Sequence, residues 1–376
     1  MKYREFGNTG VKISQLGFGC MRFPMIDVNG EQKVDREKTS AMLRRAYELG
    51  VNYFDTAVGY CNQDSERALG EGIKDFRNEI LVSSKCPMWD VKGASDYRRL
   101  LEQSLERIGT DHIDFYHFHA LNMATFDEKV LGFGLLDEAR KAKEEGLIKH
   151  VSFSFHDKPE YMAYIIEKGE GLFESVLMQY NLLDRANEDA MKNARAKGLG
   201  TVIMGPVAGG RLASPSSLGD RLLGEKDKST AALALRFVLG NKNVCCALSG
   251  MSSYEMVEEN AAIGDMDVPM TEDDFNLAKE RMDSLKKFSD LYCTGCGYCT
   301  PCPKNIHIPY IFEAYTYKNV YGMDELAKNM YAKIDGGEKH GCTPEACVNC
   351  GKCKTKCPQN IDIPVMLKKV AAELGI

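Results

Sequence analysis

The chain has 376 residues, 44% of them hydrophobic, and a formal net charge of −6. This length allows one large hydrophobic core and one further small domain. Acidic and basic residues are interleaved, and no apolar run is long enough to span a bilayer. These features argue against nucleic acid or an anionic membrane as the main partner.

The first 270 residues alternate between short β-branched or aromatic runs and segments with a 3.6-residue helical period. A hairpin is predicted first, from Tyr3–Phe6 and Val11–Ser14. Eight further runs predict strands: Leu16–Gly19, Asn52–Asp55, Ile80–Lys85, Ile113–His119, His150–Ser154, Ser175–Gln179, Thr201–Met204 and Val244–Leu248. The helical period covers Glu37–Leu49, Asp96–Arg107 and Phe126–Glu145.

Eight strands that alternate with helices over about 250 residues predict an α/β fold, the (β/α)8 TIM barrel. An open doubly wound sheet is the alternative. Its G-x-G-x-x-G turn is absent after the first strand, where Gly17-Phe-Gly19-Cys-Met-Arg22 lacks the third glycine. We therefore expect a barrel over residues 1–270, a linking helix over 271–288, and a small, mainly α-helical domain over 289–376.

Three predicted strands end in an ionisable residue: Asp55, Lys85 and His119. Tyr60 lies in the loop after Asp55, and the C-terminal ends of barrel strands share one rim. A nearby Lys makes a Tyr a better proton donor, an Asp can hold that Lys, and an imidazole can hydrogen-bond a reacting oxygen. Taken singly, each residue could instead be structural, as a helix cap, a solvated Lys or a packed barrel His. Together they suit protonation of a carbonyl oxygen while a hydride reaches its carbon.

The tail carries two cysteine runs, each closed by Cys-Pro and followed by Asn-Ile-x-Ile-Pro. The first run is Cys293, Cys296, Cys299 and Cys302, and the second is Cys347, Cys350, Cys353 and Cys357. This internal repeat predicts two [4Fe-4S] clusters, each run lending its fourth Cys to the other cluster. The first run has one residue fewer before its last Cys, so Cys342 is an alternative ligand to Cys302.

Zinc sites and disulfides fit the cysteine pattern less well. Structural zinc sites would need only one four-ligand cage per run and do not account for the repeated Cys-Pro. A disulfide framework is disfavoured because the opening residues, Met1-Lys-Tyr-Arg-Glu5, form no apolar signal segment. The clusters and the remaining thiols predict a reducing, cytoplasmic location.

Several motifs resemble those of the aldo-keto reductase family: Asp55-Thr-Ala-x-x-Tyr60, Ser84-Lys85 and the strand Ile113–His119. The whole chain resembles the branch of that family with a C-terminal dicluster ferredoxin-like domain. The resemblance implies that Tyr60 is the general acid, that Lys85 and Asp55 tune it, and that His119 orients the substrate carbonyl. His117 should point to the same side, and the motif spacing selects His119.

The resemblance also implies a nicotinamide cofactor, NADP or NAD. The carboxamide would contact Ser154 and Gln179, and the phosphates would contact the loops after the seventh and eighth strands. The adenine would contact Glu259 and Asn260. The residues so implied are Ser154, Gln179, Gly205, Gly209, Ser249, Gly250, Ser252, Glu259 and Asn260. Phe155 and Met204 replace an Asn and a stacking Tyr of many members, and Gly250 and Met256 replace basic residues that grip the 2′-phosphate. A flavin, or a barrel without a nicotinamide, therefore stays an alternative.

The sequence predicts an oxidoreductase that reduces a carbonyl, or oxidises an alcohol, of a small-molecule substrate by hydride transfer from NAD(P)H. The clusters would relay electrons to a redox partner protein or be structural. The alternative is an iron–sulfur electron-transfer protein whose barrel is a docking or ligand scaffold, or holds another cofactor. A hydride carries two electrons and a cluster one, so the clusters cannot feed a nicotinamide directly.

Overall fold

The computed structural model describes residues 1–213, 229–287, 291, 293, 297, 299–334, 341–357 and 360–374. The chain divides into two compact units, Met1–Gly209 with Ala234–Glu272 and Gly210–Leu233 with Asp273–Ile376. Within the described residues no helix has the length and apolar character needed to span a bilayer.

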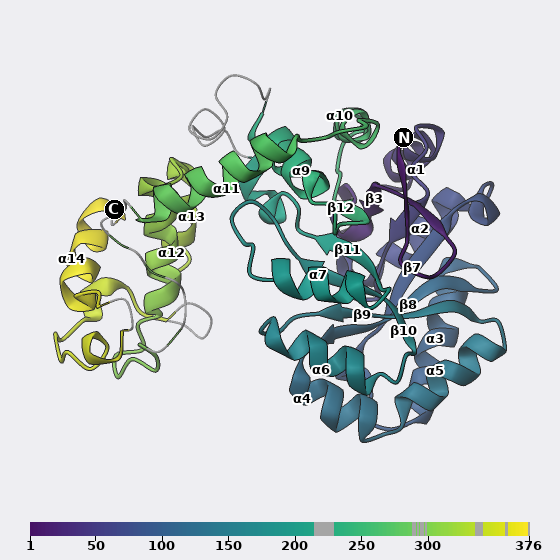
Figure 1. The fold of residues 1–376 in the computed structure, drawn as a ribbon, viewed down its shortest axis with the longest axis horizontal. Coiled ribbons are helices and arrows are strands. Elements are labelled where there is room, and N and C mark those ends of the chain that lie inside the picture. The colour runs from purple at the N-terminus through teal and green to yellow at the C-terminus, as the bar shows by residue number, and fades with distance from the viewer. Residues whose placement is uncertain are drawn as a thin grey trace. The chain divides into compact units, whose positions relative to one another are not determined.

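The first unit is built on eight parallel strands that close into a barrel (Figure 1). In chain order the strands are β3 (Leu16–Gly19), β6 (Tyr53–Asp55), β7 (Leu81–Cys86), β8 (Ile113–Leu121), β9 (Ile148–Phe155), β10 (Phe173–Gln179), β11 (Gly200–Met204) and β12 (Cys246–Ser249). Each strand pairs with the next, and β12 pairs with β3 to close the ring. The predicted barrel is confirmed, and the open sheet is excluded.

A helix follows each barrel strand and packs outside it (Figure 1). These helices are α1 (Arg36–Glu48), α2 (Ser65–Ile73), α3 (Ser95–Ile108), α5 (Leu135–Glu144), α6 (Glu160–Lys168), α7 (Glu188–Ala196), α9 (Thr230–Gly240) and α10 (Tyr254–Gly264). Local signals set their ends. Asp35 caps α1 by accepting a hydrogen bond from the Lys38 N–H, and Gly109 ends α3 with a φ of +71°.

The long helix predicted over 126–145 is interrupted. A short helix α4 (Met123–Thr125) leads into a π-helical segment, Phe126–Leu131, before α5 begins. Gly134, with a φ of +67°, separates the two helical segments, because its left-handed conformation cannot continue a right-handed helix.

The barrel core includes an aromatic cluster to which the N-terminal hairpin contributes. The hairpin pairs β1 (Tyr3–Glu5) with β2 (Lys12–Ser14), as predicted. Phe6, which follows β1, packs 4.9 Å from Phe115 and 6.0 Å from Tyr53, ring centre to ring centre, and all three are buried. Burying an aromatic or aliphatic side chain of this size stabilises the fold by about 1.5–3 kcal/mol.

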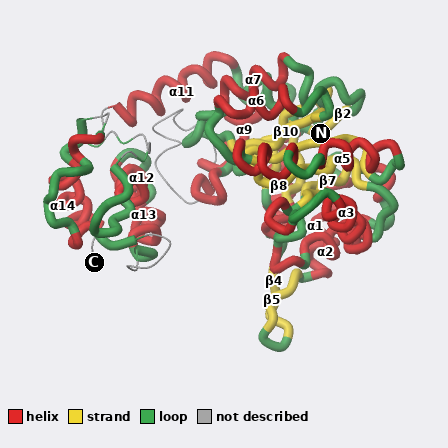
Figure 2. The backbone as a smooth tube through the Cα atoms, turned by 90° about the horizontal axis from the view of Figure 1, so that it is seen from below, coloured by secondary structure: helices red, strands yellow, loops and turns green. Residues whose placement is uncertain are grey.

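A second hairpin, β4 (Met25–Val28) and β5 (Glu31–Val34), lies between β3 and α1 and was not predicted. Figure 2 shows it projecting from the barrel. Its turn is Asn29-Gly30, with φ values of 56° and 86°. Asn-Gly is a strong signal for a two-residue hairpin turn, so the sequence does mark this hairpin.

The second unit contains four helices of eight or more residues among its described residues beyond 272. They are α11 (Glu272–Lys287), α12 (Ile308–Asn319), α13 (Asp324–Tyr331) and α14 (Ile363–Leu374). Helices α12 and α14 each begin within seven residues of a Cys-Pro pair and carry Pro309 or Pro364 in the first turn, where proline fits a helix. The predicted mainly helical tail is confirmed.

Candidate active site

Four predicted residues meet at the C-terminal rim of the barrel. Asp55 ends β6, Lys85 lies near the end of β7, His119 lies near the end of β8, and Tyr60 lies in the loop after β6. Lys85 Nζ donates to Asp55 Oδ1 at 2.6 Å and to the Thr56 carbonyl at 2.7 Å. The same ammonium lies 4.8 Å from the centre of the Tyr60 ring. The structure therefore places a charged pair directly against the Tyr60 ring.

The Lys85–Asp55 pair is buried, with Lys85 1% and Asp55 3% exposed. The second carboxylate oxygen of Asp55 accepts a hydrogen bond from Ser83 Oγ at 2.7 Å. A buried ion pair is stable only when further hydrogen bonds satisfy its remaining polar atoms. Ser83 and the Thr56 carbonyl meet that requirement, so the ammonium is fixed in position.

His119 also lies next to Tyr60. Their ring centres are 6.2 Å apart with an interplanar angle of 83°, and the Trp89 ring lies 4.9 Å from His119. The Nδ1 atom of His119 is buried and has no hydrogen-bond partner among the described residues. An unsatisfied buried nitrogen is unusual in a folded protein, and a bound ligand group would satisfy it.

A β-bulge places His119 at the rim. The β8–β9 register shifts between Phe118 and Leu121, and Ala120 has a φ of +55°. The Ala120 N–H donates to Ser154 Oγ at 2.7 Å, which holds this strained backbone. His117 lies deeper, fully buried, with Nε2 3.5 Å from the Tyr53 hydroxyl. The two histidines therefore have different surroundings.

The buried setting sets the protonation states at the rim. Burial, then Lys85 and His156, lower the pKa of His119 to about 3, so its imidazole is neutral at physiological pH. Burial alone would lower the pKa of Lys85, but Asp55 and Tyr60 outweigh it and the net direction is upward. Burial raises the pKa of Tyr60 more than Lys85 lowers it. The pKa of Tyr60 therefore lies above its ordinary value. The sequence alone had predicted that the nearby Lys85 would make Tyr60 a better proton donor.

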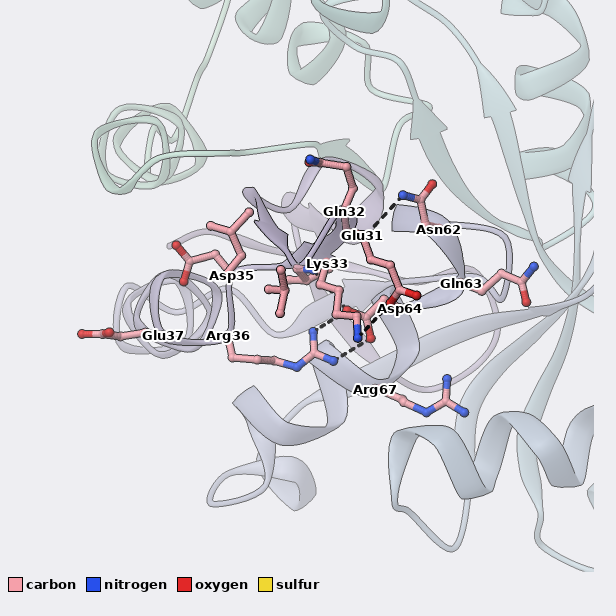
Figure 3. Close-up of a pocket in the computed structure, with 13 residues that line it drawn as sticks. Glu31, Gln32, Lys33, Asp35, Arg36, Glu37, Asn62, Gln63, Asp64 and Arg67 are labelled. Atoms are coloured by element: carbon pink, nitrogen blue, oxygen red, sulfur yellow. Dashed lines mark hydrogen bonds and ion pairs between the residues drawn. The ribbon is translucent and has the colours of Figure 1, made fainter.

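The loop after Tyr60 has an unusual backbone. Cys61, Asn62 and Gln63 have consecutive φ values of 49°, 54° and 67°. Asp64, the next residue, accepts hydrogen bonds from both terminal nitrogens of Arg36, at 2.9 and 2.6 Å, and from the Val34 N–H at 3.1 Å. Figure 3 shows this Arg36–Asp64 pair in a pocket between the β4–β5 hairpin and the loop. The pair holds the end of a strained loop that begins at Tyr60.

The proposed cofactor residues lie at the ends of the next four strands. The Gln179 Oε1 atom lies 3.0 Å from the point where a Cβ on Gly205 would stand, and Gly205 has a φ of +63°. Ser249 Oγ accepts a hydrogen bond from Asn260 Nδ2 at 3.0 Å. The side-chain amide of Gln179 and the buried Ser154 hydroxyl provide the polar atoms that a carboxamide needs, and glycine turns allow close backbone approach to phosphates. These residues fit a nicotinamide dinucleotide.

The remaining predicted cofactor residues are spread over the loops and helix that follow. Gly209 and Gly250 are exposed in the loops after β11 and β12, and Ser252 is exposed just before α10. Glu259 and Asn260 lie on α10, where Glu259 is exposed. Ser253 caps this helix by accepting from the Met256 N–H at 3.3 Å.

Cysteines from both runs line one cavity in the second unit. They are Cys299, Cys302, Cys347, Cys350 and Cys353, and prolines and apolar side chains such as Ile306 and Leu367 complete the lining. Three thiols from the second run and two from the first therefore lie around one space, although within the described ranges no three Cys, His, Asp or Glu side chains are grouped closely enough to hold a metal ion. Cys342 is not in this lining, which favours Cys302 as the shared ligand. Cys296 lies outside the described residues, and Cys293 and Cys357 do not line this cavity.

Comparison with known families agrees with both halves of the chain. A model of the aldo/keto reductase family matches residues 15–282, and a model of the 4Fe-4S dicluster domain matches residues 292–361. The chain belongs to the aldo-keto reductase family. It is therefore an oxidoreductase of that family with a C-terminal 4Fe-4S dicluster domain.

Individual relatives of this aldo-keto reductase align with the barrel. L-galactose dehydrogenase of Arabidopsis thaliana is 30% identical over 286 residues, covering 70% of this chain and 88% of the relative. The NADH-specific methylglyoxal reductase of Escherichia coli is 24% identical over 336 residues, covering 76% and 100%. The holo form of aldo-keto reductase AKR11C1 from Bacillus halodurans has a TM-score of 0.64 at 24% identity, covers 75% of this chain and 96% of its own, and shows the shared fold.

Sequence reasoning missed three features of this aldo-keto reductase's rim. His156 follows β9 and helps to lower the pKa of His119. Arg36 holds Asp64 at the end of the Tyr60 loop. Arg22 lies between the loops that follow β11 and β12. No periodic pattern marks these residues, because each acts through a contact with a distant part of the chain.

Proposed function

We propose that this aldo-keto reductase reduces the carbonyl group of a small molecule with NADH or NADPH as the hydride donor, or oxidises the matching alcohol with NAD+ or NADP+ as the hydride acceptor. The observation that carries the proposal is the buried Lys85–Asp55 pair against Tyr60, with neutral His119 on the same rim. We assign residues 1–270 to this activity.

The residues have distinct roles in the proposed reaction. A bound nicotinamide supplies the hydride. Tyr60 donates its phenolic proton to the carbonyl oxygen, and the Lys85 ammonium stabilises the phenolate that remains. Asp55 keeps Lys85 charged in its buried position. His119 is neutral, so it donates a hydrogen bond to the same oxygen without competing as an acid.

The choice of substrates to test follows from the rim and from the relatives. Trp89 is 53% exposed and lies against His119, so it forms an apolar wall beside the reacting oxygen. The E. coli relative is named a methylglyoxal reductase, and the A. thaliana relative an L-galactose dehydrogenase. Small aldehydes, including methylglyoxal, and aldose sugars, including L-galactose, are the substrates to test first.

The experiment uses cluster-loaded protein under anaerobic conditions and follows the loss of NADH or NADPH absorbance with aldehydes, and the gain of that absorbance with sugars and NAD+ or NADP+. We expect turnover in the wild type and a loss of about 10²-fold or more in Tyr60→Phe, which lacks the proton to be donated. Tyr47→Phe, on helix α1, is the matched control and should keep wild-type turnover, because the Tyr47 hydroxyl bonds to Glu79 and its ring packs on Phe76. Full activity in Tyr60→Phe would show that Tyr60 is not the acid.

The cysteine cavity supports a second function for the tail. We propose that residues 289–376 hold two [4Fe-4S] clusters through Cys293, Cys296, Cys299, Cys302, Cys347, Cys350, Cys353 and Cys357. Such clusters exchange one electron at a time, so we assign them to transfer with a redox partner protein rather than to the hydride step. If cluster-loaded protein shuttles electrons but reduces no carbonyl, the chain is an electron-transfer protein with a barrel scaffold.

A further inference from the structure

Arg22 lies between the loops that follow β11 and β12, although it comes from the turn after β3. Its Nη2 atom donates to the Gly209 carbonyl at 2.8 Å. A Cβ built on Gly250 would stand 3.1 Å from Arg22 Cδ and 3.2 Å from Cγ. The Arg22 stem therefore occupies space that is open because residue 250 has no side chain. One long cationic side chain spans both loops.

Arg22 carries a full positive charge. Among the residues that the structure describes, no carboxylate forms an ion pair with Arg22, whereas Arg36 and Arg45 are each paired with two acids. A guanidinium has five N–H donors, and the Gly209 carbonyl uses one of them. Arg22 is also exposed, so its remaining donors can reach a ligand. This is the arrangement that a phosphate needs.

The surroundings of Arg22 also favour an anion. Gly209 has a φ of 68°, a backbone conformation that residues with side chains rarely adopt. On the other side, Ser253 caps the eleven-residue helix α10, whose N-terminus carries the positive end of the helix dipole. Arg22 adds a full positive charge between these two loops.

We infer that Arg22 binds a phosphate group of the dinucleotide. The inference rests on the function proposed above. Arg22 supplies a cation to the space beside Gly250 from the turn after β3. Two phosphate groups share this chemistry: the pyrophosphate present in both NADH and NADPH, and the 2′-phosphate present only in NADPH.

The test measures the Kd of NADH and of NADPH by calorimetry, without turnover. Arg22→Ala should raise Kd about 10- to 100-fold, as expected for losing a charge-assisted hydrogen bond to phosphate. Arg22→Lys keeps the charge and should lose less. Lys33→Ala, which removes an exposed cation from the β4–β5 hairpin, is the matched control and should keep wild-type affinity.

The two cofactors separate the two phosphates. Equal weakening for NADH and NADPH assigns Arg22 to the pyrophosphate, and weakening for NADPH alone assigns it to the 2′-phosphate. Unchanged affinity for both, with a wild type that binds, overturns the inference and leaves the proposed function intact. A wild type that binds neither dinucleotide overturns both.

A second variant tests whether a cation at residue 250 can take the place of Arg22. In the Arg22→Ala background, Gly250→Lys should restore much of the lost affinity, because a cation then enters the vacated space from the other loop. Gly250→Lys alone should not tighten binding, because its Cβ would press on the Arg22 stem. If the double variant is folded by circular dichroism but binds the dinucleotide as weakly as Arg22→Ala, residues 22 and 250 do not place a cation in the same space.

Discussion

At the scale of single residues, burial sets the chemistry of the rim. Lys85 and His119 both lie out of water, yet their pKa values move in opposite directions. Lys85 has Asp55 to stabilise its charge, whereas His119 has Lys85 nearby and no acid. The result is a fixed cation beside a neutral imidazole. Tyr60, whose pKa is raised further above neutrality by burial, is protonated at neutral pH.

We expect kcat/KM for carbonyl reduction to show no inflection near pH 6.5, the ordinary pKa of His. His119, with a pKa of about 3, stays neutral across that range, and Tyr60 stays protonated until the pH exceeds its raised pKa. The rate should therefore be flat from about pH 5 to 8 and fall only in alkali. His119→Gln should lower the rate about tenfold or more without changing the shape of this profile.

The profile must be measured with the clusters intact at each pH. An inflection near pH 6.5 in the wild type that disappears in His119→Gln would mean that His119 titrates during turnover. That result would contradict a neutral hydrogen-bond donor and would make His119 the acid.

The four rim residues could be predicted from sequence because each stands at or just after the end of a strand in a recognisable motif. The protonation states of these residues could not be predicted in this way. The sequence predicted that Lys85 would lower the pKa of Tyr60, but the structure shows that burial outweighs this effect. The depth of a side chain depends on the whole fold, and no local pattern reports it.

At the scale of elements, the loop after Tyr60 depends on a contact with α1. Arg36, the first residue of α1, forms a two-bond pair with Asp64 at the end of three left-handed residues. Burial raises the pKa of Asp64, but Arg36 and the Val34 N–H outweigh it, and the net direction is downward. The carboxylate is therefore charged at neutral pH and anchors the loop.

Arg36→Met should lower turnover several-fold, because the Tyr60 loop loses its anchor, while global stability falls by only about 1 kcal/mol for a partly exposed pair. Arg44→Met is the matched control on the same helix, since Arg44 pairs with Asp75 on the surface. Kinetics and urea unfolding of both variants check this. Equal turnover in the two variants would mean that the Arg36–Asp64 pair does not position Tyr60.

The elements themselves were largely predictable. All eight barrel strands were found from β-branched and aromatic runs, because parallel strands buried on both faces are strongly apolar. The β4–β5 hairpin was missed because its residues are mostly exposed and only half of its strand residues are apolar, although Asn29-Gly30 marks its turn. The helix predicted over 126–145 ran through Gly132 and Gly134, where the structure breaks it.

At the scale of the whole molecule, the chain joins an aldo-keto reductase barrel, to which we assign a two-electron hydride transfer, to a 4Fe-4S dicluster domain, to which we assign one-electron transfer. The cysteine cavity includes thiols from both runs, so the repeat folds as one structure rather than as two separate cages. This arrangement favours shared iron–sulfur clusters over two independent zinc sites. The irregular first run could be read from sequence, but the position of Cys302 in the cavity could not.

The fourth ligand from the first run can be identified by metal content. Wild-type protein should contain about eight iron and about eight sulfide per chain, as for two [4Fe-4S] clusters. Cys302→Ser should lose about half of the iron, because one cluster loses a ligand, whereas Cys342→Ser should keep it. Iron and sulfide analysis of anaerobically purified variants checks this. If Cys342→Ser loses iron and Cys302→Ser does not, Cys342 is the cluster ligand in place of Cys302. About two zinc per chain without iron would contradict the prediction of iron–sulfur clusters.

The central claim is that carbonyl reduction at the rim is a direct hydride transfer assisted by Tyr60, separate from the clusters. The most direct test uses NADH or NADPH deuterated at the reactive carbon and follows deuterium by mass spectrometry. Direct transfer predicts one deuterium on the former carbonyl carbon of the alcohol, and almost no product from Tyr60→Phe. If the electrons instead pass singly through the clusters, the product takes its hydrogen from solvent and carries no deuterium, and the account is wrong.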